Sequence, residues 1–261
     1  MRPMKSSIER VVIKVGTSSL THENGKINLK YLDQLCWEIA HLMDLGYQVI
    51  LVSSAAIAVG AFGMGMKERP REVIAKQAAS AVGQVALMNL YTQGFSHHGY
   101  MPAQILLTKI IEGNEEMTLN AQNTFERLLA QQLIPIVNEN DAISTYEIEY
   151  GDNDTLSAMV ARLVGADLLI LLTDTDGLYS DNPRKNPEAE RISYVPAITA
   201  EVEAVAQGAG SALGTGGMAT KIKAAKLAGE KGIDTIIANG RDIGLLEEMI
   251  GGEDIGTFFK G

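Results

Sequence analysis

The chain has 261 residues and a mass of 28.0 kDa, which favours one large domain because domains contain roughly 100–200 residues. Hydrophobic residues make up 46% and charged residues 21%, a composition that can bury a core and is too apolar for a disordered protein. A formal net charge of −10 disfavours binding to nucleic acid or to an anionic membrane, so a phosphate would need a local binding device.

The cysteine and histidine content excludes two kinds of site. The single cysteine, Cys36, cannot form a disulfide within the chain, and with four histidines it does not supply a common zinc site. The segment from Met1 to Arg10 lacks the apolar run of a signal peptide. These features lead us to expect a reducing, cytoplasmic location.

Short apolar runs bounded by turn residues predict buried β-strands. They are Arg10–Gly16, Gln48–Ser53, Met101–Leu107, Leu133–Val137, Asp167–Thr173 and Asp234–Ala238, with Gly256–Phe259 as a closing strand. Helices are predicted at 29–43, Arg71–Phe95, Thr118–Gln131, Asn153–Val164, Met218–Gly229 and Ile243–Met249. The alternation predicts an α/β fold, a three-layer α/β/α sandwich with a mostly parallel central sheet, built as a single domain over residues 1–261.

The uncharged stretch from Leu45 to Met66 has the length of a membrane span, which needs about 20 residues. Its serines, glycines and alanines make it too weakly hydrophobic for that role. We interpret it as a strand followed by a turn of small residues. Cys36 lies on the apolar stripe of the first predicted helix, so we expect it in the core.

Lys14 interrupts an apolar strand just before Gly16. Burying an ammonium group without an anion is costly. A lysine at a strand end can extend its head group to solvent. The functional interpretation is a point charge for a phosphate, with Gly16 allowing the backbone to approach the ligand closely.

A glycine-rich loop, Gly214 to Gly217, leads into the predicted helix that carries Lys221. The N-terminus of such a helix presents N–H groups and a positive dipole end to an anion. Lys221 in the first turn opposes this dipole unless a negative ligand offsets its charge. The loop is not a Rossmann fingerprint, since no strand precedes it, and not a Walker-type loop; a purely structural loop is the alternative.

The segment from Glu139 to Asp154 contains six acidic residues and no lysine or arginine. Such a cluster calls for cations, which could be magnesium, a substrate ammonium group or the two lysines above. It lacks the pattern of an EF-hand. Asp141 and Asp154 are the best candidates because they flank a strand end and a helix start. The outer acids could form a solvated loop, and Asn153 could simply cap the next helix.

Two further strand ends carry polar residues, and ligands of open α/β sheets collect beyond such ends. Thr173 and Asp174 end one strand before the turn at Asp176-Gly177. Ser54 follows the strand Gln48–Ser53. Because it lacks the flanking glycines of a nucleophile elbow, Ser54 is a hydrogen-bonding candidate and not a hydrolase nucleophile.

Taken together, these motifs resemble the amino acid kinase family. Lys-Val-Gly-Thr-Ser, Asn-Glu-Asn-Asp, Gly-Asp-Asn-Asp, Leu-Leu-Thr-Asp and Gly-Thr-Gly-Gly-Met-Ala-Thr-Lys occur in the order and spacing of that family. The resemblance covers nearly the whole chain and implies the amino acid kinase fold. It also implies ATP-dependent phosphorylation of the γ-carboxylate of L-glutamate to L-glutamyl 5-phosphate, the first step of proline biosynthesis.

The same resemblance assigns roles to individual residues. Lys14 and Lys221 would neutralise the transferring phosphoryl group, and Asp154 would hold the two lysines in position. Ser54, Asp141 and Asn153 would bind glutamate. The implied ATP-binding residues are Lys14, Thr173, Asp174, Thr215, Gly216, Gly217, Met218, Ala219, Thr220 and Lys221.

The resemblance also implies cofactors and partners. Magnesium (Mg2+) would arrive with ATP as co-substrate, so no residue is expected to serve as a metal ligand. The chain would form a homo-oligomer, proline would act as a feedback inhibitor, and the product would pass to glutamyl phosphate reductase. Neither nucleic acid nor a membrane is expected as a partner.

The chain departs from the family pattern at one position near the substrate. The family usually has Ser-Gly-Ala-Ile after its second strand, whereas this chain has Ser54-Ala55-Ala56-Ile57. The methyl group of Ala55 could crowd a backbone N–H that faces substrate. Many relatives also append a C-terminal PUA domain, and this chain resembles the short form without one.

Two other functions stay open on the same fold. A sister kinase would act on N-acetylglutamate, aspartate or a nucleoside monophosphate, but those relatives typically have Gly-Gly or Ser-Gly after the first lysine. A non-catalytic nucleotide-binding regulator is the second alternative. The presence of both Lys14 and Lys221 argues against it, because binding alone would tolerate the loss of one.

Overall fold

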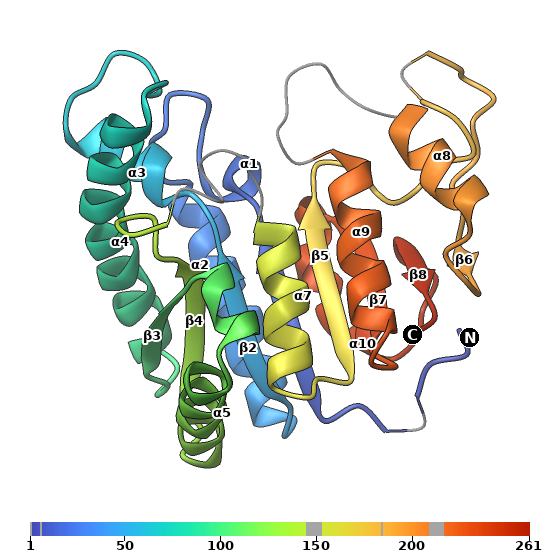
Figure 1. Ribbon diagram of the computed structural model, residues 1–261, viewed down its shortest axis with the longest axis horizontal. Coiled ribbons are helices and arrows are strands. Elements are labelled where there is room, and N and C mark those ends of the chain that lie inside the picture. The colour runs from blue at the N-terminus through green and yellow to red at the C-terminus, as the bar shows by residue number, and fades with distance from the viewer. Residues whose placement is uncertain (1, 6, 145–152, 184, 209–216) are drawn as a thin grey trace. The chain divides into compact units, whose positions relative to one another are not determined.

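The computed structural model describes residues 2–5, 7–144, 153–183, 185–208 and 217–261 (Figure 1). Its contacts divide the chain into two compact units. Unit 1 comprises Met1–Lys14 and Asp154–Gly261, and unit 2 comprises Val15–Asn153. That residues 1–261 act as one domain stays a prediction.

Unit 2 contains three parallel strands. They are β2 (Gln48–Ser53), β3 (Pro102–Leu107) and β4 (Ile134–Glu139), in the order β3-β4-β2. In this register Leu51 of β2 pairs with Ile136 of β4, and both are buried. Because parallel strands point the same way, the polar residues that follow β2 and β4 emerge at one edge of this part of the sheet.

Unit 1 contains the remaining described strands. They are β1 (Arg10–Val15, whose last residue belongs to unit 2), β5 (Leu168–Thr173), β6 (Tyr194–Val195), β7 (Asp234–Asn239) and β8 (Thr257–Phe259), in the order β1-β5-β7-β8-β6. β5 and β7 are parallel, whereas β7 and β8 are antiparallel. The predicted α/β class and the mostly parallel sheet are therefore confirmed, and each predicted strand is present with ends shifted by a residue or two.

Helices alternate with these strands. Unit 2 has α1 (Thr17–Leu20), α2 (Leu29–Asp44), α3 (Ala56–Gly63), α4 (Val73–Ser96), the 3-10 helix η1 (Lys109–Gly113) and α5 (Glu115–Ala130). Unit 1 has α8 (Ala200–Gly208), α9 (Met218–Gly229), the 3-10 helix η2 (Gly240–Leu245) and α10 (Leu246–Ile250), while α7 (Asn153–Leu163) starts at the last residue of unit 2. Among the described residues, no helix combines the length and hydrophobicity of a membrane span.

The sequence analysis was wrong about the segment after β2. We expected a turn of small residues there, and the structure has helix α3. Its residues are almost all small or apolar, so no polar face marks a helical period. A second difference is the start of α5 at Glu115, because Asn114 caps the helix by accepting a hydrogen bond from the backbone N–H of Met117 at 3.0 Å.

Cys36 lies in the core, as predicted from its place on the stripe of α2. It is fully buried, and burial raises the pKa of its thiol to about 12. A thiol in this state is a small apolar side chain and not a nucleophile.

Helices α3 and α4 pack with almost no side chain between them. A Cβ placed on Gly83 of α4 would lie 1.8 Å from the carbonyl oxygen of Ala56, and one placed on Gly60 of α3 would lie 1.7 Å from that of Ala79. Both distances are far inside van der Waals contact. The two glycines thus set how closely α4 approaches the start of α3, and α4 carries the side chains that organise the site described below.

We expect Gly83→Ala to destabilise the protein by several kcal/mol, since the added methyl overlaps backbone atoms that cannot move separately. Gly63→Ala is the matched control, because a Cβ at Gly63 meets nothing within 4 Å and Gly63 is also helical. That variant should be neutral or slightly more stable. Urea unfolding of both variants measures the difference, and equal stabilities would contradict the packing argument.

Candidate functional site

The catalytic residues predicted in unit 1 form a buried cluster. Lys14 lies near the end of β1, Asp154 in the first turn of α7 and Lys221 in the first turn of α9. The Lys14 Nζ is 2.7 Å from Oδ1 of Asp154, and the Lys221 Nζ is 3.0 Å from Oδ2. The Asp154 side chain is fully buried and each lysine side chain is only 5% exposed. The structure therefore brings these three predicted residues together.

The lysine–aspartate trio places two ammonium groups beside one carboxylate. Ammonium groups that are positioned in advance stabilise negative charge on a ligand. The arrangement is therefore suited to an anion that arrives with the substrate, and the lysine heads are held in place before it binds.

The start of α9 adds hydrogen-bond donors beside Lys221. Gly217 is the N-cap and provides no side chain. The Thr220 Oγ1 lies 3.0 Å from Oδ2 of Asp154 and 2.8 Å from the carbonyl oxygen of Gly217, and its single proton is donated to one or shared between the two. Backbone N–H groups of a first turn favour an anion. Met218 and Ala219 lie in this turn. Thr215 and Gly216, also predicted to bind ATP, lie outside the described residues.

Thr173 and Asp174 stand at the end of β5, as predicted. The Thr173 hydroxyl donates a hydrogen bond to Oδ1 of Asp174 at 3.2 Å. Thr173 is buried and Asp174 is exposed. The pair is thus positioned by the strand, with its carboxylate accessible to a ligand.

In unit 2 the predicted substrate residues Ser54 and Asn153 are in contact. The Asn153 Nδ2 faces three acceptors, the Ser54 Oγ at 3.0 Å, the carbonyl oxygen of Ser53 at 3.2 Å and Oδ1 of Asn138 at 2.8 Å, and its two protons are shared among them. Ser54, Asn138 and Asn153 are all buried. The structure thus links the ends of β2 and β4 to the first residue of α7 through one amide group.

The third predicted substrate residue, Asp141, is held by helix α4. The Ser80 hydroxyl donates to Oδ2 of Asp141 at 2.5 Å, and the Gln77 Nε2 donates to its carbonyl oxygen at 2.8 Å. Burial raises the pKa of the Asp141 carboxyl group, and the hydrogen bond from Ser80 opposes the shift. Glu139 lies nearby: burial raises its pKa, the hydrogen bond with Ser144 lowers it, and the charge of Asp141 raises it again.

Three buried acceptor atoms near the end of β4 and the start of α7 have no hydrogen-bond donor among the described residues. They are Oε1 of Glu139, Oδ1 of Asp141 and Oδ1 of Asn153. An unsatisfied buried acceptor costs free energy, and all three would be satisfied by a donor, two of them by a positively charged one. Unit 2 therefore offers what an ammonium group requires, whereas the trio of unit 1 offers what a phosphate requires.

Ala55 adopts the backbone conformation that the glycine of the family pattern would suit better. Its φ is +83°, in the left-handed region that costs an L-residue roughly 1–2 kcal/mol, and it is the N-cap of α3. The strain lies in the backbone conformation, whereas the sequence analysis considered only crowding of a backbone N–H by the methyl group. It fixes the direction of the chain directly after Ser54.

We expect Ala55→Gly to increase the free energy of unfolding by up to about 1 kcal/mol, because the relieved strain exceeds the extra entropy of glycine in the unfolded chain. Ala58→Gly within α3 is the control and should lose about 1 kcal/mol, since Ala58 has ordinary helical geometry. Urea unfolding reads out both. Loss of stability in both variants would show that Ala55 is unstrained.

The sequence analysis missed the residues of α4 that hold this site. Gln77, Ser80 and Gln84 lie at positions i, i+3 and i+7, so they share one face of the helix. The spacing was visible in the sequence. Polar residues at this spacing usually mark a solvent-facing stripe, however, and only the structure shows Ser80 and Gln84 buried against β4 and the residues after it.

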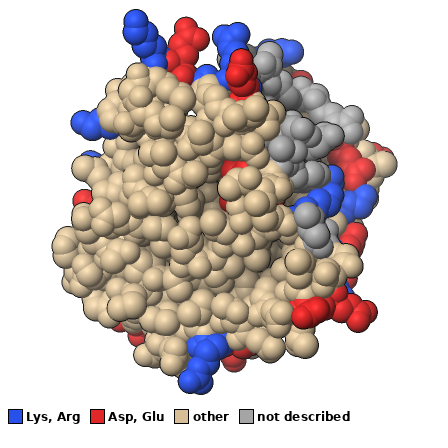
Figure 2. Space-filling view, turned by 60° about the vertical axis from the view of Figure 1, so that its left-hand side comes forward, with Lys and Arg blue, Asp and Glu red and all other residues tan. Residues whose placement is uncertain are grey.

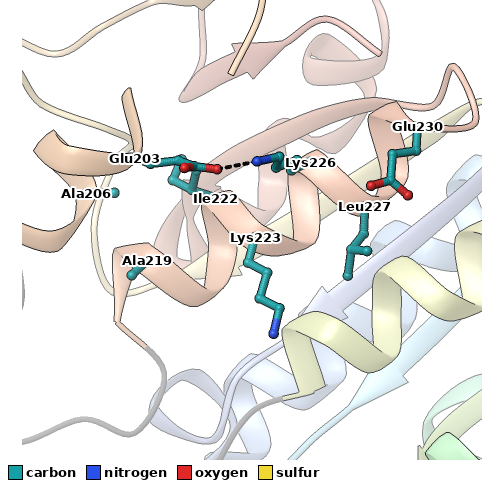
Figure 3. A pocket seen from close by; sticks show the side chains of 8 residues that line it. All are labelled: Glu203, Ala206, Ala219, Ile222, Lys223, Lys226, Leu227 and Glu230. Carbon is teal, nitrogen blue, oxygen red and sulfur yellow. Dashed lines mark hydrogen bonds and ion pairs between the residues drawn. The ribbon is translucent and has the colours of Figure 1, made fainter. Parts of the chain in front are cut away.

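A separate pocket of about 360 Å3 lies between α8 and α9 (Figure 3). Glu203 and Lys226 form an ion pair of 2.6 Å at its wall, and Lys223 points away from that pair. Of the predicted ATP-binding residues that the structure describes, only Ala219 lines it. The balanced charges give this pocket no preference for an anion.

Comparison with known proteins assigns the family. Residues 9–239 match the family model described as the amino acid kinase family. The chain therefore belongs to the amino acid kinase family.

The curated relatives are more specific. The chain is 48% identical to glutamate 5-kinase of Clostridium perfringens (strain 13 / Type A), an alignment that covers 99% of this chain and 98% of the relative. It is 49% identical to glutamate 5-kinase of Moorella thermoacetica, where 97% of this chain matches 67% of a longer relative.

Solved structures bear out the predicted fold. UMP kinase from Bacillus anthracis has a TM-score of 0.66 at 16% identity, with 97% of this chain and 96% of that chain covered. Carbamate kinase from Giardia lamblia bound to AMP-PNP has the same TM-score and identity, with 98% and 99% covered. At these identities the likeness shows the fold, and the amino acid kinase fold is confirmed.

Proposed function

We propose that this chain transfers the γ-phosphoryl group of ATP to the γ-carboxylate of L-glutamate, giving L-glutamyl 5-phosphate. The observation that carries the proposal is the trio in which Lys14 and Lys221 share the buried Asp154. Relatives named glutamate 5-kinase at 48% and 49% identity over nearly the full chain support the substrate.

Phosphoryl transfer to a carboxylate needs no covalent intermediate with the protein, because the attacking oxygen is already a nucleophile. Orientation of the reactants and neutralisation of charge are sufficient. The ammonium groups of Lys14 and Lys221 stabilise the negative charge of the transferring group and of the leaving phosphate oxygens. Asp154 keeps both ammonium groups positioned before the nucleotide binds.

Glutamate binding falls to the residues of unit 2. Its α-ammonium group satisfies the unpartnered acceptor atoms of Asp141 and Asn153, and Ser54 offers a hydroxyl group to a substrate carboxylate. Asn153 and Asp154 are consecutive residues at the start of α7. One peptide unit therefore joins the residue proposed for glutamate to the residue that holds the lysines.

The nucleotide is proposed to bind at the start of α9 and at the end of β5, through Gly217 to Thr220 and through Thr173 and Asp174. The described residues contain no group of three or more His, Cys, Asp or Glu side chains that could hold a metal ion. Magnesium is proposed to arrive bound to the phosphates of ATP. When bound, it supplies further neutralisation of phosphate charge.

The test is ADP release by the purified protein with L-glutamate, with N-acetylglutamate, with L-aspartate and without an amino acid. We expect release that depends on L-glutamate. Release with N-acetylglutamate or aspartate at an equal or greater rate would favour a sister kinase. Nucleotide binding without release under any condition would favour the non-catalytic regulator.

We further propose that a second copy of this chain covers the exposed side of α4. Figure 2 shows a broad face with few charged side chains, on the side of the molecule where α3 and α4 lie in Figure 1. In α4 the only charged residue is Lys76, and exposed apolar positions include Ile74, Val82 and Val85. A large uncharged face on a protein of net charge −10 is typical of an interface between copies.

We expect Ile74→Glu to shift the protein from an oligomer to a monomer, because Ile74 is 80% exposed on α4 and an interface over this helix would bury the new carboxylate without a partner. Light scattering during gel filtration measures the mass. Glu126→Lys on α5, an exposed charged position, is the control and should leave the mass unchanged. A monomeric wild type would refute the oligomer.

The remaining partners are proposed from the glutamate 5-kinase function. Proline carries an α-carboxylate and a cationic nitrogen, so it is proposed to compete with glutamate for the acceptor atoms of unit 2. The acyl phosphate product hydrolyses in water, which favours its direct transfer to glutamyl phosphate reductase. A cytoplasmic location is proposed for the kinase and the reductase. Inhibition that does not depend on glutamate concentration would contradict the proline site.

A further inference from the structure

The buried amide groups of unit 2 form a hydrogen-bonded chain whose direction is fixed at one end. The carbonyl oxygen of Ser53 can only accept a hydrogen bond, so the atom of Asn153 that faces it at 3.2 Å must be Nδ2. The same Nδ2 faces Asn138 at 2.8 Å, so Asn138 must present Oδ1 to it. The backbone of β2 therefore sets the orientation of both side chains, without any choice of amide flip.

Gln84 of α4 stands at the other end of this chain. With its Oδ1 turned to Asn153, Asn138 turns its Nδ2 toward Gln84, whose Oε1 accepts the hydrogen bond at 3.0 Å. Asn138 is 2% exposed and Gln84 is 9% exposed, so water does not readily replace this acceptor. The third member, Asn153, is left with its Oδ1 buried and without a donor among the described residues.

We propose that Gln84 is a positioning residue that makes this site selective for a substrate with a free ammonium group. It holds the Asn138 amide so that Asn153 must direct an acceptor, and not a donor, toward the substrate. The inference rests on the proposed function, since the ammonium group in question is that of L-glutamate. Gln84 itself does not touch the reacting atoms in this account.

The alternative orientation explains why the acceptor of Gln84 matters. Without it, the buried Asn138 Nδ2 loses its partner, and rotation of the Asn138 amide alone does not supply a new one, because it places Nδ2 against the Nδ2 of Asn153. Two N–H groups would then face each other. The conflict is relieved only if Asn153 also rotates, which breaks its bond to the Ser53 carbonyl and points Nδ2 at the substrate ammonium group.

The same face of α4 braces the neighbouring residues. Ser80, one turn before Gln84, donates to Oδ2 of Asp141 and leaves Oδ1 as an unpartnered acceptor. Tyr91, two turns after Gln84, is fully buried, and its hydroxyl lies 2.8 Å from the Ser53 Oγ. One helix face thus determines which atoms of Asp141 and Asn153 remain available to hydrogen-bond the substrate. These atoms are the two Oδ1 oxygens, and both are acceptors.

Three variants test the proposal. Gln84→Met removes the acceptor while keeping similar volume, and Gln84→Glu keeps an acceptor oxygen at the same place. Leu87→Ala, at a buried apolar position one turn along α4, controls for general loss of packing. Thermal unfolding first establishes that each variant is folded at the assay temperature.

Two readouts separate positioning from stability. The first is the KM for L-glutamate, which should rise about tenfold or more in Gln84→Met while kcat and the KM for ATP change little. The second is the rise in unfolding midpoint with L-glutamate compared with glutarate, which lacks the ammonium group. The preference for L-glutamate should be lost in Gln84→Met and kept in Gln84→Glu and Leu87→Ala.

The inference is overturned if Gln84→Met keeps both the KM and the preference for L-glutamate over glutarate, or if Leu87→Ala loses that preference to the same extent. It is also overturned if wild type binds glutarate as well as L-glutamate. A wild type that prefers L-glutamate in binding but releases no ADP would refute the proposed kinase function and leave the role of Gln84 supported by the binding readout.

Discussion

Replacing Lys221 by alanine should lower kcat/KM by a factor on the order of 10² or more, as the loss of one preorganised charge donor commonly does. The Lys221 ammonium group is held 3.0 Å from the buried Asp154, at the start of a helix whose dipole opposes it. A position so unfavourable for a cation is explained by an anion that both the helix and the lysine bind.

The variant should remain folded. Removing one partner of a buried ion pair costs about 3–5 kcal/mol when the other charge is left uncompensated, but Asp154 keeps Lys14 at 2.7 Å and the hydroxyl of Thr220 at 3.0 Å. Lys223→Ala is the matched control, because Lys223 is an exposed lysine on the same helix. It should retain wild-type kinetics.

Coupled ADP assays of both variants, below their unfolding midpoints, give the measurement. A second readout is chemical rescue. Added propylammonium should restore part of the activity of Lys221→Ala and should leave the activity of Lys223→Ala unchanged. Near wild-type turnover in folded Lys221→Ala would refute the catalytic role proposed for the trio.

The trio could be predicted from sequence because charged residues stood where local patterns exclude them. Lys14 interrupts a buried strand, and Lys221 lies in a first helical turn where a cation is disfavoured. Each anomaly signalled a partner that local structure does not provide. That Asp154 is the common partner followed only from the family resemblance until the structure placed both ammonium groups on it.

The polar face of α4 could not be predicted in the same way. Gln77, Ser80 and Gln84 are ordinary residues for a helix surface, so no local rule is violated. The burial of Ser80 and Gln84 depends on the close packing allowed by Gly60 and Gly83, and a sequence alone does not show that one helix backbone touches another. The positive φ of Ala55 could not be predicted either, because alanine rarely adopts the left-handed conformation.

The second large effect is expected at Asp141, whose replacement by asparagine should reduce the preference for L-glutamate over N-acetylglutamate. Free glutamate carries an ammonium group that pairs with the Asp141 carboxylate, and acetylation removes that charge. The acetylated analogue would leave a desolvated carboxylate unpaired in wild type, at roughly 2–5 kcal/mol, or about 30-fold to several thousand-fold in kcat/KM.

Asp141→Asn should shrink this preference mainly by weakening glutamate, with the KM for ATP nearly unchanged. Ser80→Ala is a useful companion, because it removes only the hydrogen bond to Oδ2 of Asp141 and keeps the charge. It should retain most of the preference. Steady-state kinetics on both amino acids decide the matter: equal use of the two by wild type refutes the substrate, and an unchanged preference in Asp141→Asn refutes the role of Asp141.

Ligand-free stability gives an independent readout of the same carboxylate. Burial raises the pKa of Asp141 above its value in the unfolded chain, so the folded state favours the protonated form. The destabilisation is therefore absent below the unfolded pKa of about 4 and grows as the pH rises through the folded pKa. Asp141→Asn removes this effect while Glu139 remains in both proteins.

The variant should consequently gain unfolding free energy over wild type as the pH rises through this window. Saturating L-glutamate should make wild type the more stable of the two proteins, because it stabilises wild type alone. A stability difference that is independent of pH would mean that Asp141 is solvated and not the buried acceptor of a substrate ammonium group.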